Sequence, residues 1–190
     1  MMDGWNGERQ IGQKLDDIEI KHVERYLFAR DYCKDKDVLD AACGCGYGSN
    51  ILSKEANTVL GVDYSQEAID YAKKYWIAEN ISFRQFDLNF DLTPLGRFDV
   101  IVSFETIEHL DIPIIKTCQN FYKSLYNGGL LILSHPEKER KSGASTFHKH
   151  FDIKGDEVRK MMIDIGFHIE NEWYQVGRFD FPYHLIVGRK

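Results

Sequence analysis

Apolar positions along the chain follow two patterns that alternate. Short continuous or alternating apolar runs predict strands, because a strand covered on both faces of a sheet is apolar throughout. Apolar residues spaced three and four apart among charges predict amphipathic helices. The runs at 38–40, 58–63, 81–86, 98–104 and 130–133 predict strands with helical repeats before, between and after them. Two later runs, 167–176 and 183–187, predict an antiparallel pair.

Local signals indicate where the predicted helices begin and end. Apolar spacing between 11 and 27 predicts one or two amphipathic helices before the first strand. Ser65 is a plausible N-cap for a helix with its apolar face at 68–76. The sequence Asn127-Gly128-Gly129 predicts the end of a helix over 114–125, and Gly166 the end of one over 158–165. The element order αα-βαβαβ-β-αβ-α-ββ predicts a doubly wound α/β sheet.

The segment 38–48, VLDAACGCGYG, is the most informative in the chain. An apolar run passes through Asp40 and into Gly44, Gly46 and Gly48, which predicts a tight turn from a strand into a helix around a ligand. Asp63 ends the next apolar run, nineteen positions after Gly44, where a carboxylate accepts hydrogen bonds from a ribose diol. These positions point to a nucleotide-like cofactor.

Two alternatives to that interpretation are open. A structural glycine turn and a helix-capping Asp63 need no ligand at all. A dinucleotide site fits less well, because the NAD fingerprint GxGxxG places a glycine where this chain has Ser49.

Composition limits the class of protein. With 190 residues, 43% of them hydrophobic, the chain suits one domain over 1–190 with a single core. The net charge of −6 disfavours nucleic acid as a partner and suits a small molecule or a glycan. No apolar run approaches the ~20 residues of a membrane span. Four cysteines without a signal peptide lead us to expect reduced thiols and a cytoplasmic location.

Five motifs together resemble the class I S-adenosylmethionine-dependent methyltransferases. They are DAACGCGYG at 40–48, VLGVDYS at 59–65, FDL at 86–88, RFDVIVSFETIEHL at 97–110 and NGGLLILS at 127–134. With HVERYLFA at 22–29, the likeness is to a subgroup of type 11/12-like enzymes that often modify glycans and small metabolites. The resemblance implies a Rossmann-like sheet of seven strands, mostly parallel with an antiparallel C-terminal pair. It also implies S-adenosyl-L-methionine as cofactor, lying across the carboxyl ends of the first four strands.

The resemblance assigns roles around the glycine turn. Gly44 and Gly46 would pass beside the methionine part of the cofactor, and Asp40 would orient the turn. Ala42 stands where the family often has glycine. Tyr26, with Arg25, would reach the cofactor carboxylate, although a solvated helix face explains both residues as well.

Other residues would hold the ribose, the adenine and the rest of the methionine. Asp63 would accept the ribose hydroxyls while Tyr64 lies against the adenine. Asp87 would accept the adenine amino group and the Leu88 backbone would address a ring nitrogen, although acidic turns are common after strands. Ser103 and Phe104 would line the methionine side.

The acceptor side has three interpretations. Glu105, Glu108 and His109 share one face of a helical turn, and His148 and His150 follow later in the chain. These groups suit a divalent metal site, and the pattern is similar to that of small-RNA 2′-O-methyltransferases and of some catechol-type O-methyltransferases. Alternatively, His109 or His148 acts directly as a general base. The third interpretation is a structural helix cap.

We therefore expect transfer of a methyl group to a hydroxyl or amine of a small molecule or glycan. Metal-assisted O-methylation of an RNA or catechol-like acceptor is the alternative, and a non-catalytic nucleotide-binding module is a further one. Loop 134–156 and helices over 8–30 are expected to enclose the substrate. The expected assembly is a monomer or a homodimer.

Overall fold

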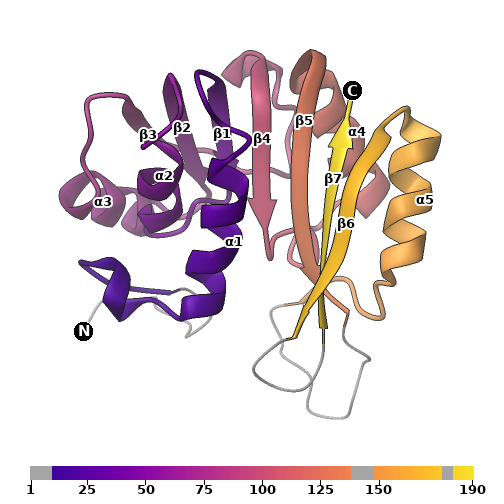
Figure 1. The fold of residues 1–190 in the computed structure, drawn as a ribbon, viewed down its shortest axis with the longest axis horizontal. Coiled ribbons are helices and arrows are strands. Elements are labelled where there is room, and N and C mark those ends of the chain that lie inside the picture. Colours follow the sequence, from indigo (N-terminus) through magenta and orange to yellow (C-terminus); the bar gives the residue numbers. More distant parts are fainter. Residues whose placement is uncertain (1–9, 138–147, 177–181) are drawn as a thin grey trace. The chain divides into compact units, whose positions relative to one another are not determined.

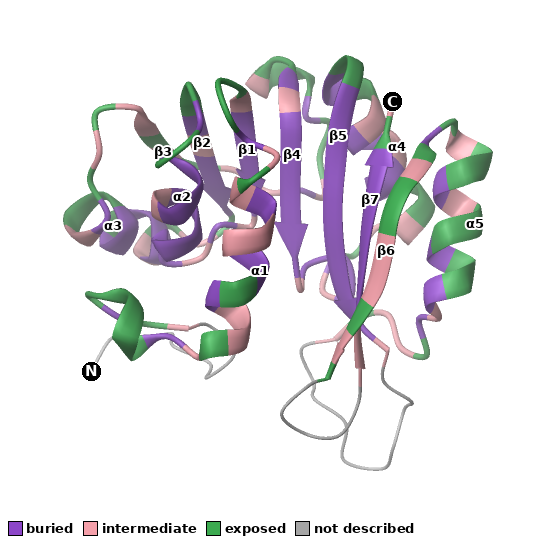
Figure 2. Ribbon diagram, viewed as in Figure 1, coloured by how far each residue is buried: buried purple, intermediate pink, exposed green. Residues whose placement is uncertain are grey.

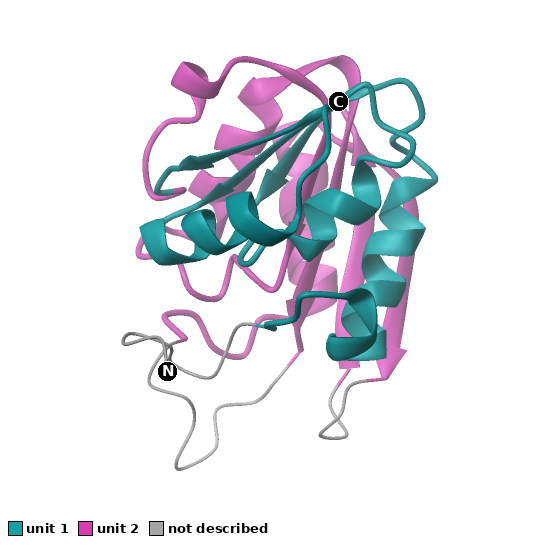
Figure 3. Cartoon of the chain, turned by 90° about the vertical axis from the view of Figure 1, so that its left-hand side faces the viewer, with its two compact units in different colours: residues 1–87 teal, residues 88–190 magenta. Residues whose placement is uncertain are grey.

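The computed structural model describes residues 10–137, 148–176 and 182–190. The chain divides into two compact units, Met1–Asp87 and Leu88–Lys190 (Figure 3). Each unit is described by itself below. The expectation of one domain over 1–190 stays a prediction.

The first unit alternates strands and helices after a short N-terminal segment. Its three strands are parallel, with β2 hydrogen-bonded to β1 on one side and to β3 on the other. The inner faces of α2 and α3 are apolar and buried, as their helical spacing predicts. The elements are η1 (Leu15–Asp17), α1 (Ile20–Arg30), β1 (Asp37–Ala41), α2 (Tyr47–Leu52), β2 (Thr58–Asp63), α3 (Gln66–Tyr75) and β3 (Ile81–Gln85).

The second unit ends in an antiparallel arrangement. Strand β5 is parallel to β4 and antiparallel to β7, and β7 is antiparallel to β6. The middle of β5 and most of β7 are fully buried (Figure 2), which explains their continuous apolar runs. The elements are η2 (Thr93–Leu95), β4 (Phe98–Phe104), α4 (Ile114–Ser124), β5 (Leu125–Pro136), α5 (Gly155–Ile165), β6 (His168–Val176) and β7 (Pro182–Arg189).

The strand order is β3-β2-β1-β4-β5-β7-β6 (Figure 1). This topology confirms the predicted α/β fold with a seven-stranded, mostly parallel sheet and an antiparallel C-terminal pair. Within the described ranges, no helix combines the length and the apolar character needed to cross a membrane.

Local helix signals were accurate in two places and wrong in one. Ser65 is the N-cap of α3, with its Oγ accepting a hydrogen bond from the Ala68 N–H at 3.3 Å. Gly166 ends α5 with a left-handed φ of 119°. The segment Asn127-Gly128-Gly129, by contrast, lies inside β5, because α4 already ends at Ser124.

The two predicted enclosing segments are only partly described. Of the N-terminal region 8–30, the described part holds a single 3₁₀ turn at Leu15–Asp17 before α1. Of loop 134–156, β5 occupies the beginning through Pro136, α5 starts at Gly155, and residues 138–147 lie outside the described residues. The enclosing role of these segments stays a prediction.

A chain of polar groups, with two buried histidines at its centre, crosses the antiparallel strands of the second unit. His135 on β5 faces His184 on β7 in register, and their rings are joined by a 3.0 Å contact between Nε2 and Nδ1. His184 Nε2 donates to the Glu172 carboxylate at 2.8 Å, and Arg159 contacts the other oxygen of that carboxylate at 3.0 Å. Because His184 Nε2 is a donor, the neutral pair requires His135 Nε2 to donate to His184 Nδ1.

The remaining nitrogen of His135 gains little from protonation in this environment. His135 is fully buried, and its Nδ1 lies 3.3 Å from the Pro136 carbonyl oxygen. Burial, and then the neighbouring His184, lower the pKa of His135 to about 4. The folded chain therefore keeps His135 neutral at pH values where an unfolded chain protonates it.

This shift predicts that the protein loses stability as the solution is acidified. Between pH 6.5 and about 4 the unfolded state binds a proton at His135 that the folded state does not bind, so stability falls as the pH falls through that window. By pH 5 the loss from this residue is about 2 kcal/mol. Urea unfolding at pH 7 and pH 5 measures it.

His135→Asn is expected to remove this part of the pH dependence, whereas His168→Asn, at an exposed histidine of β6, leaves it intact. Identical pH dependence in His135→Asn and in the unchanged protein would contradict the assignment.

Candidate functional site

The glycine turn between β1 and α2 has the left-handed backbone that its sequence predicts. Gly44 has a φ of 53° and Gly46, the N-cap of α2, a φ of 89°. Ala42 also has a positive φ, 68°, which is a strained conformation for a residue with a Cβ atom. That strain gives a physical reason why glycine suits position 42.

The three glycines of the turn have different surroundings. A Cβ atom on Gly46 would lie 2.6 Å from the Ala72 Cβ and 2.9 Å from the Phe83 ring, and one on Gly48 would lie 2.1 Å from the Tyr26 ring. A Cβ atom on Gly44 meets no described atom within 4 Å. Gly46 and Gly48 therefore allow close packing, while Gly44 is the glycine whose backbone borders open space.

The Asp63 carboxylate holds this turn in place. One oxygen accepts the Gly44 N–H at 3.0 Å, and the other accepts the Ser65 N–H at 2.9 Å. Asp63 is buried at the end of β2, so these bonds tie the glycine turn to the beginning of α3.

Asp40 has an internal role in the same unit. Its two oxygens accept the Tyr26 hydroxyl at 3.1 Å and the Ser49 hydroxyl at 2.6 Å, which joins α1 and α2 to β1. Complete burial raises the pKa of Asp40 to about 6, although both hydrogen bonds oppose the rise. The Tyr26 hydroxyl is therefore directed to Asp40, and the role of Asp40 in orienting the glycine turn stays a prediction.

Arg25 lies inside the unit. The residue is 2% exposed, so the solvated helix face that we considered for it is wrong. Its Nη2 lies 3.0 Å from Nδ1 of His22. Burial and the adjacent Arg25 charge lower the pKa of His22 to about 3, which keeps the imidazole neutral.

The residues predicted to meet adenine lie at the ends of β2 and β3. Tyr64 directly follows Asp63 and is 62% exposed, which is high for an aromatic side chain and suits a stacking surface. Asp87 is half-buried at the last position of the first unit, and Leu88 is buried at the first position of the second. Their contacts with a cofactor stay predictions.

At the end of β4, in the second unit, Ser103 and Phe104 are both buried. The Ser103 hydroxyl has no hydrogen-bond partner within the described part of the chain. A buried hydroxyl in that condition favours a ligand or a water as its partner.

Glu105 follows β4 in a strained conformation. Its φ is 52°, its N–H donates to the Ser134 carbonyl at 3.1 Å, and its carboxylate accepts the Ser134 hydroxyl at 2.7 Å. The next residues form a single turn, closed by the His109 N–H donating to the Thr106 carbonyl at 3.0 Å, rather than a helix.

Glu108, His109 and His148 come together in this unit. One potential ligand atom from each lies within 4.8 Å of the others, and the two imidazole rings meet edge to face. The Glu108 carbonyl accepts the N–H groups of Lys149 at 2.7 Å and His150 at 3.0 Å, which fixes the segment that carries His148.

Two predicted members stand outside this cluster. The Glu105 carboxylate is engaged by Ser134, and His150 Nε2 lies 2.9 Å from the Ile112 carbonyl oxygen. Sequence reasoning had not singled out Ser49 and Ser134, the hydroxyls that hold Asp40 and Glu105. Neither has a motif of its own, because each acts through a contact that only the fold creates.

Comparison with known proteins agrees with these motifs. A family model described as "Methyltransferase domain" matches residues 38–129. A probable S-adenosylmethionine-dependent methyltransferase of Mycobacterium tuberculosis is 30% identical over 177 residues, which cover 85% of this chain and 60% of the relative. These matches make the chain similar to S-adenosylmethionine-dependent methyltransferases, and residues 38–129 similar to a methyltransferase domain.

The proteins that resemble the chain have names that state different acceptors or none. The ubiquinone biosynthesis O-methyltransferase of Coxiella burnetii is 33% identical over 138 residues, covering 70% of this chain and 56% of the relative. The N-methyltransferase NodS of Bradyrhizobium japonicum, solved with S-adenosyl-L-homocysteine, has a TM-score of 0.73 at 18% identity, covering 90% of this chain and 86% of that one. The chain spans about 60% of the length of the curated relatives that it matches.

The different surroundings of Gly44 and Gly46 give a matched pair of substitutions in this chain. Gly46→Ala combines left-handed strain with overlap against Ala72 and Phe83, so we expect a loss of about 3 kcal/mol or more. Gly44→Ala has only the strain, about 1 to 2 kcal/mol. Urea unfolding of both variants measures the difference in stability. Equal losses would show that a Cβ atom at position 44 does not point into open space.

Proposed function

We propose that this chain binds S-adenosyl-L-methionine and transfers its methyl group to a hydroxyl or amine of a small-molecule or glycan acceptor. The observation that supports this most directly is the glycine turn, with Gly44 bordering open space and its N–H held by Asp63. A backbone that approaches a ligand without a Cβ atom, beside a buried carboxylate at the end of a strand, suits a ligand with a ribose.

The reaction requires mainly positioning. S-adenosyl-L-methionine supplies a methyl group on a positively charged sulfur, so the carbon is already activated toward a nucleophile. An acceptor oxygen or nitrogen attacks this carbon in line, the carbon–sulfur bond breaks and its electron pair stays on sulfur, and the acceptor gives up its proton. The chain must therefore hold the acceptor near ~3 Å from the methyl carbon and receive that proton.

The second unit supplies groups suited to receive the proton. His109 and His148 are partly exposed, and Glu108 beside them is buried, with one carboxylate oxygen 3.8 Å from His109 Nε2. We assign His109 or His148 as general base, and Glu108 as the residue that orients it. The turn-anchoring Glu105 supports their backbone.

Calorimetry tests the cofactor assignment. We expect the unchanged protein to bind S-adenosyl-L-methionine and not NAD, because position 49 lacks the third glycine of the dinucleotide pattern. Asp63→Asn replaces a charged acceptor of backbone N–H groups, and we expect at least tenfold weaker binding. The matched control is Asp164→Asn at an exposed position of α5.

Two outcomes would count against the assignment. Binding of NAD without S-adenosyl-L-methionine would replace the methyl donor by a dinucleotide. Binding of the methyl donor without release of S-adenosyl-L-homocysteine in the presence of any cell-extract acceptor would leave a non-catalytic binding module.

Metal-assisted O-methylation is the second candidate, and the cluster of Glu108, His109 and His148 favours it. One carboxylate and two imidazoles form a donor set that divalent transition metals accept, and their ligand atoms lie within 4.8 Å of one another. A bound cation would lower the pKa of an acceptor hydroxyl, which suits an RNA 2′-hydroxyl or a catechol. Glu105 and His150 are left out of this set because of their own contacts.

Single substitutions separate the metal from the general-base assignment. For a metal site, His109→Ala and His148→Ala each lower both bound metal and turnover at least tenfold, while affinity for the methyl donor stays unchanged. His150→Ala is the matched control, since its imidazole lies against the Ile112 carbonyl. Metal content by mass spectrometry and turnover after chelation are the measurements, and full activity after chelation would eliminate the metal.

A further inference from the structure

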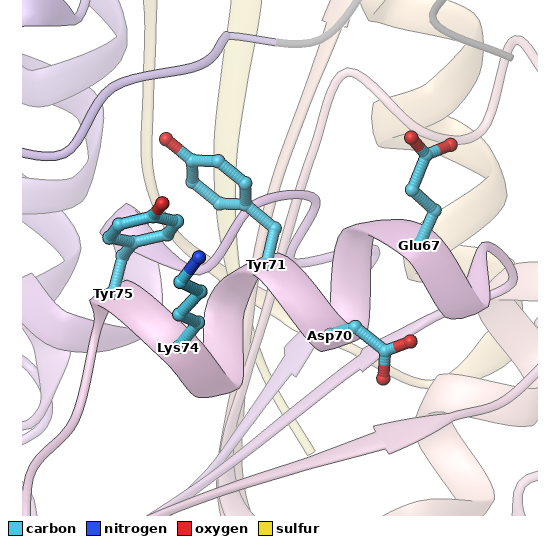
Figure 4. Close-up of a pocket in the computed structure, with 5 residues that line it drawn as sticks. All are labelled: Glu67, Asp70, Tyr71, Lys74 and Tyr75. Carbon is cyan, nitrogen blue, oxygen red and sulfur yellow. The ribbon is translucent and has the colours of Figure 1, made fainter. Parts of the chain in front are cut away.

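One face of α3 borders a cavity that the glycine turn and the Glu108 cluster do not use. Its volume is about 400 Å³, within the range of small-ligand sites. The lining comes from a single helical stripe (Figure 4): Glu67, Asp70, Tyr71, Lys74 and Tyr75. All of these residues belong to the first unit.

Tyr71 is the buried member of the lining. The residue is 7% exposed, and its side chain extends from the same side of α3 as those of Tyr75 and Glu67 (Figure 4). Burial, and then Cys45, Tyr75 and Asp17, raise the pKa of Tyr71. No other described residue forms a hydrogen bond with the Tyr71 hydroxyl, so this group is available to a ligand.

Helix α3 packs against the glycine turn. A Cβ atom on Gly46 would lie 2.6 Å from the Cβ of Ala72, the residue that follows Tyr71. The helix that lines the cavity therefore contacts the segment that we propose for the methyl donor.

Two aromatic rings make up the apolar part of the lining. The centroids of the Tyr71 and Tyr75 rings lie 4.5 Å apart with their planes tilted by 42°. The Lys74 ammonium lies 5.0 Å from the Tyr75 ring centroid. Such rings offer flat apolar surface together with hydroxyl groups that donate and accept hydrogen bonds.

Charges of both signs surround the rings. Among the described residues Glu67 has no hydrogen bond or ion pair, and Lys74 has only its contact with the Tyr75 ring. Asp70 projects away from the other side chains (Figure 4) and accepts a 2.7 Å hydrogen bond from Gln66. The Glu67 carboxylate accepts hydrogen bonds and the Lys74 ammonium donates them, which suits a ligand with many hydroxyl groups.

We propose that the α3 cavity is a binding subsite for a neutral sugar ring of a glycan acceptor. A sugar ring has an apolar C–H face for the Tyr71 and Tyr75 rings and hydroxyl groups for the Glu67 carboxylate, the Lys74 ammonium and the Tyr71 hydroxyl. This proposal narrows the acceptor class and so rests on the proposed function, but sugar binding itself needs no methyl donor.

The test is saturation-transfer NMR and calorimetry on the full chain without methyl donor. The probes are glucose, galactose, mannose, N-acetylglucosamine and rhamnose, with choline and inorganic phosphate as the cationic and anionic comparisons. We expect at least one sugar to bind. Tyr71→Phe, which removes only the hydroxyl, is expected to weaken that binding about fivefold, and Tyr75→Ala at least tenfold.

Matched variants on the same helix locate the subsite. Lys74→Ala and Glu67→Gln are expected to weaken sugar binding, whereas Lys73→Ala, at an exposed neighbour outside the cavity, leaves it unchanged. These three variants, like Tyr71→Phe and Tyr75→Ala, are expected to keep the affinity for S-adenosyl-L-methionine.

Three results would overturn the subsite: no response to any sugar, an equal loss in Lys73→Ala, or a response to choline or phosphate only. Sugar binding in a protein that does not bind S-adenosyl-L-methionine would overturn the proposed function and leave the subsite standing. The two failures are therefore distinguishable.

Discussion

The Asp63 carboxylate is the interaction on which the first unit depends most. It ends β2, is buried, and accepts one backbone N–H from the glycine turn and one from the residue that caps α3. Hydrogen bonds to a charged acceptor contribute about 1.5 to 3 kcal/mol each, and removing a buried acceptor leaves its donors unsatisfied. One side chain therefore sets the position of Gly44 and the direction in which α3 leaves the sheet.

Carboxylates at two other strand ends also accept hydrogen bonds close to residues with a left-handed backbone. Asp40 on β1 binds Tyr26 and Ser49 shortly before the left-handed Ala42. Glu105 itself has a left-handed φ of 52° after β4, and Ser134 on β5 holds both its N–H and its carboxylate. Left-handed residues with side chains persist only where their surroundings determine them, and they concentrate at functional sites.

Sequence reasoning succeeded where the signal is local. Strands appear as buried apolar runs, and Ser65 caps α3 through an N–H three residues away. The glycine turn was predicted as a ligand loop, but the sequence does not distinguish Gly44 from Gly46, because the difference is the ring of Phe83 and the Cβ of Ala72 on other elements. The Asn127-Gly128-Gly129 signal was outweighed by the pairing of β5 with its neighbours.

The sequence does not predict long-range side-chain pairs, for the same reason. His135 and His184 are 49 positions apart and meet only through the register of β5 and β7. Which of His148 and His150 joins Glu108 and His109 depends on two backbone hydrogen bonds to the Glu108 carbonyl and on the Ile112 carbonyl. The α3 stripe has a helical spacing that the sequence displays, yet its cavity depends on what faces it.

The central claim is that the turn held by Asp63 is the methyl-donor site, and an amide NMR titration tests it most directly. S-adenosyl-L-homocysteine is expected to shift the Gly44 and Ser65 amide resonances saturably, and NAD at the same concentration to leave them in place. Saturable shifts with NAD alone, or binding of S-adenosyl-L-homocysteine that leaves Gly44 unshifted, would contradict the claim.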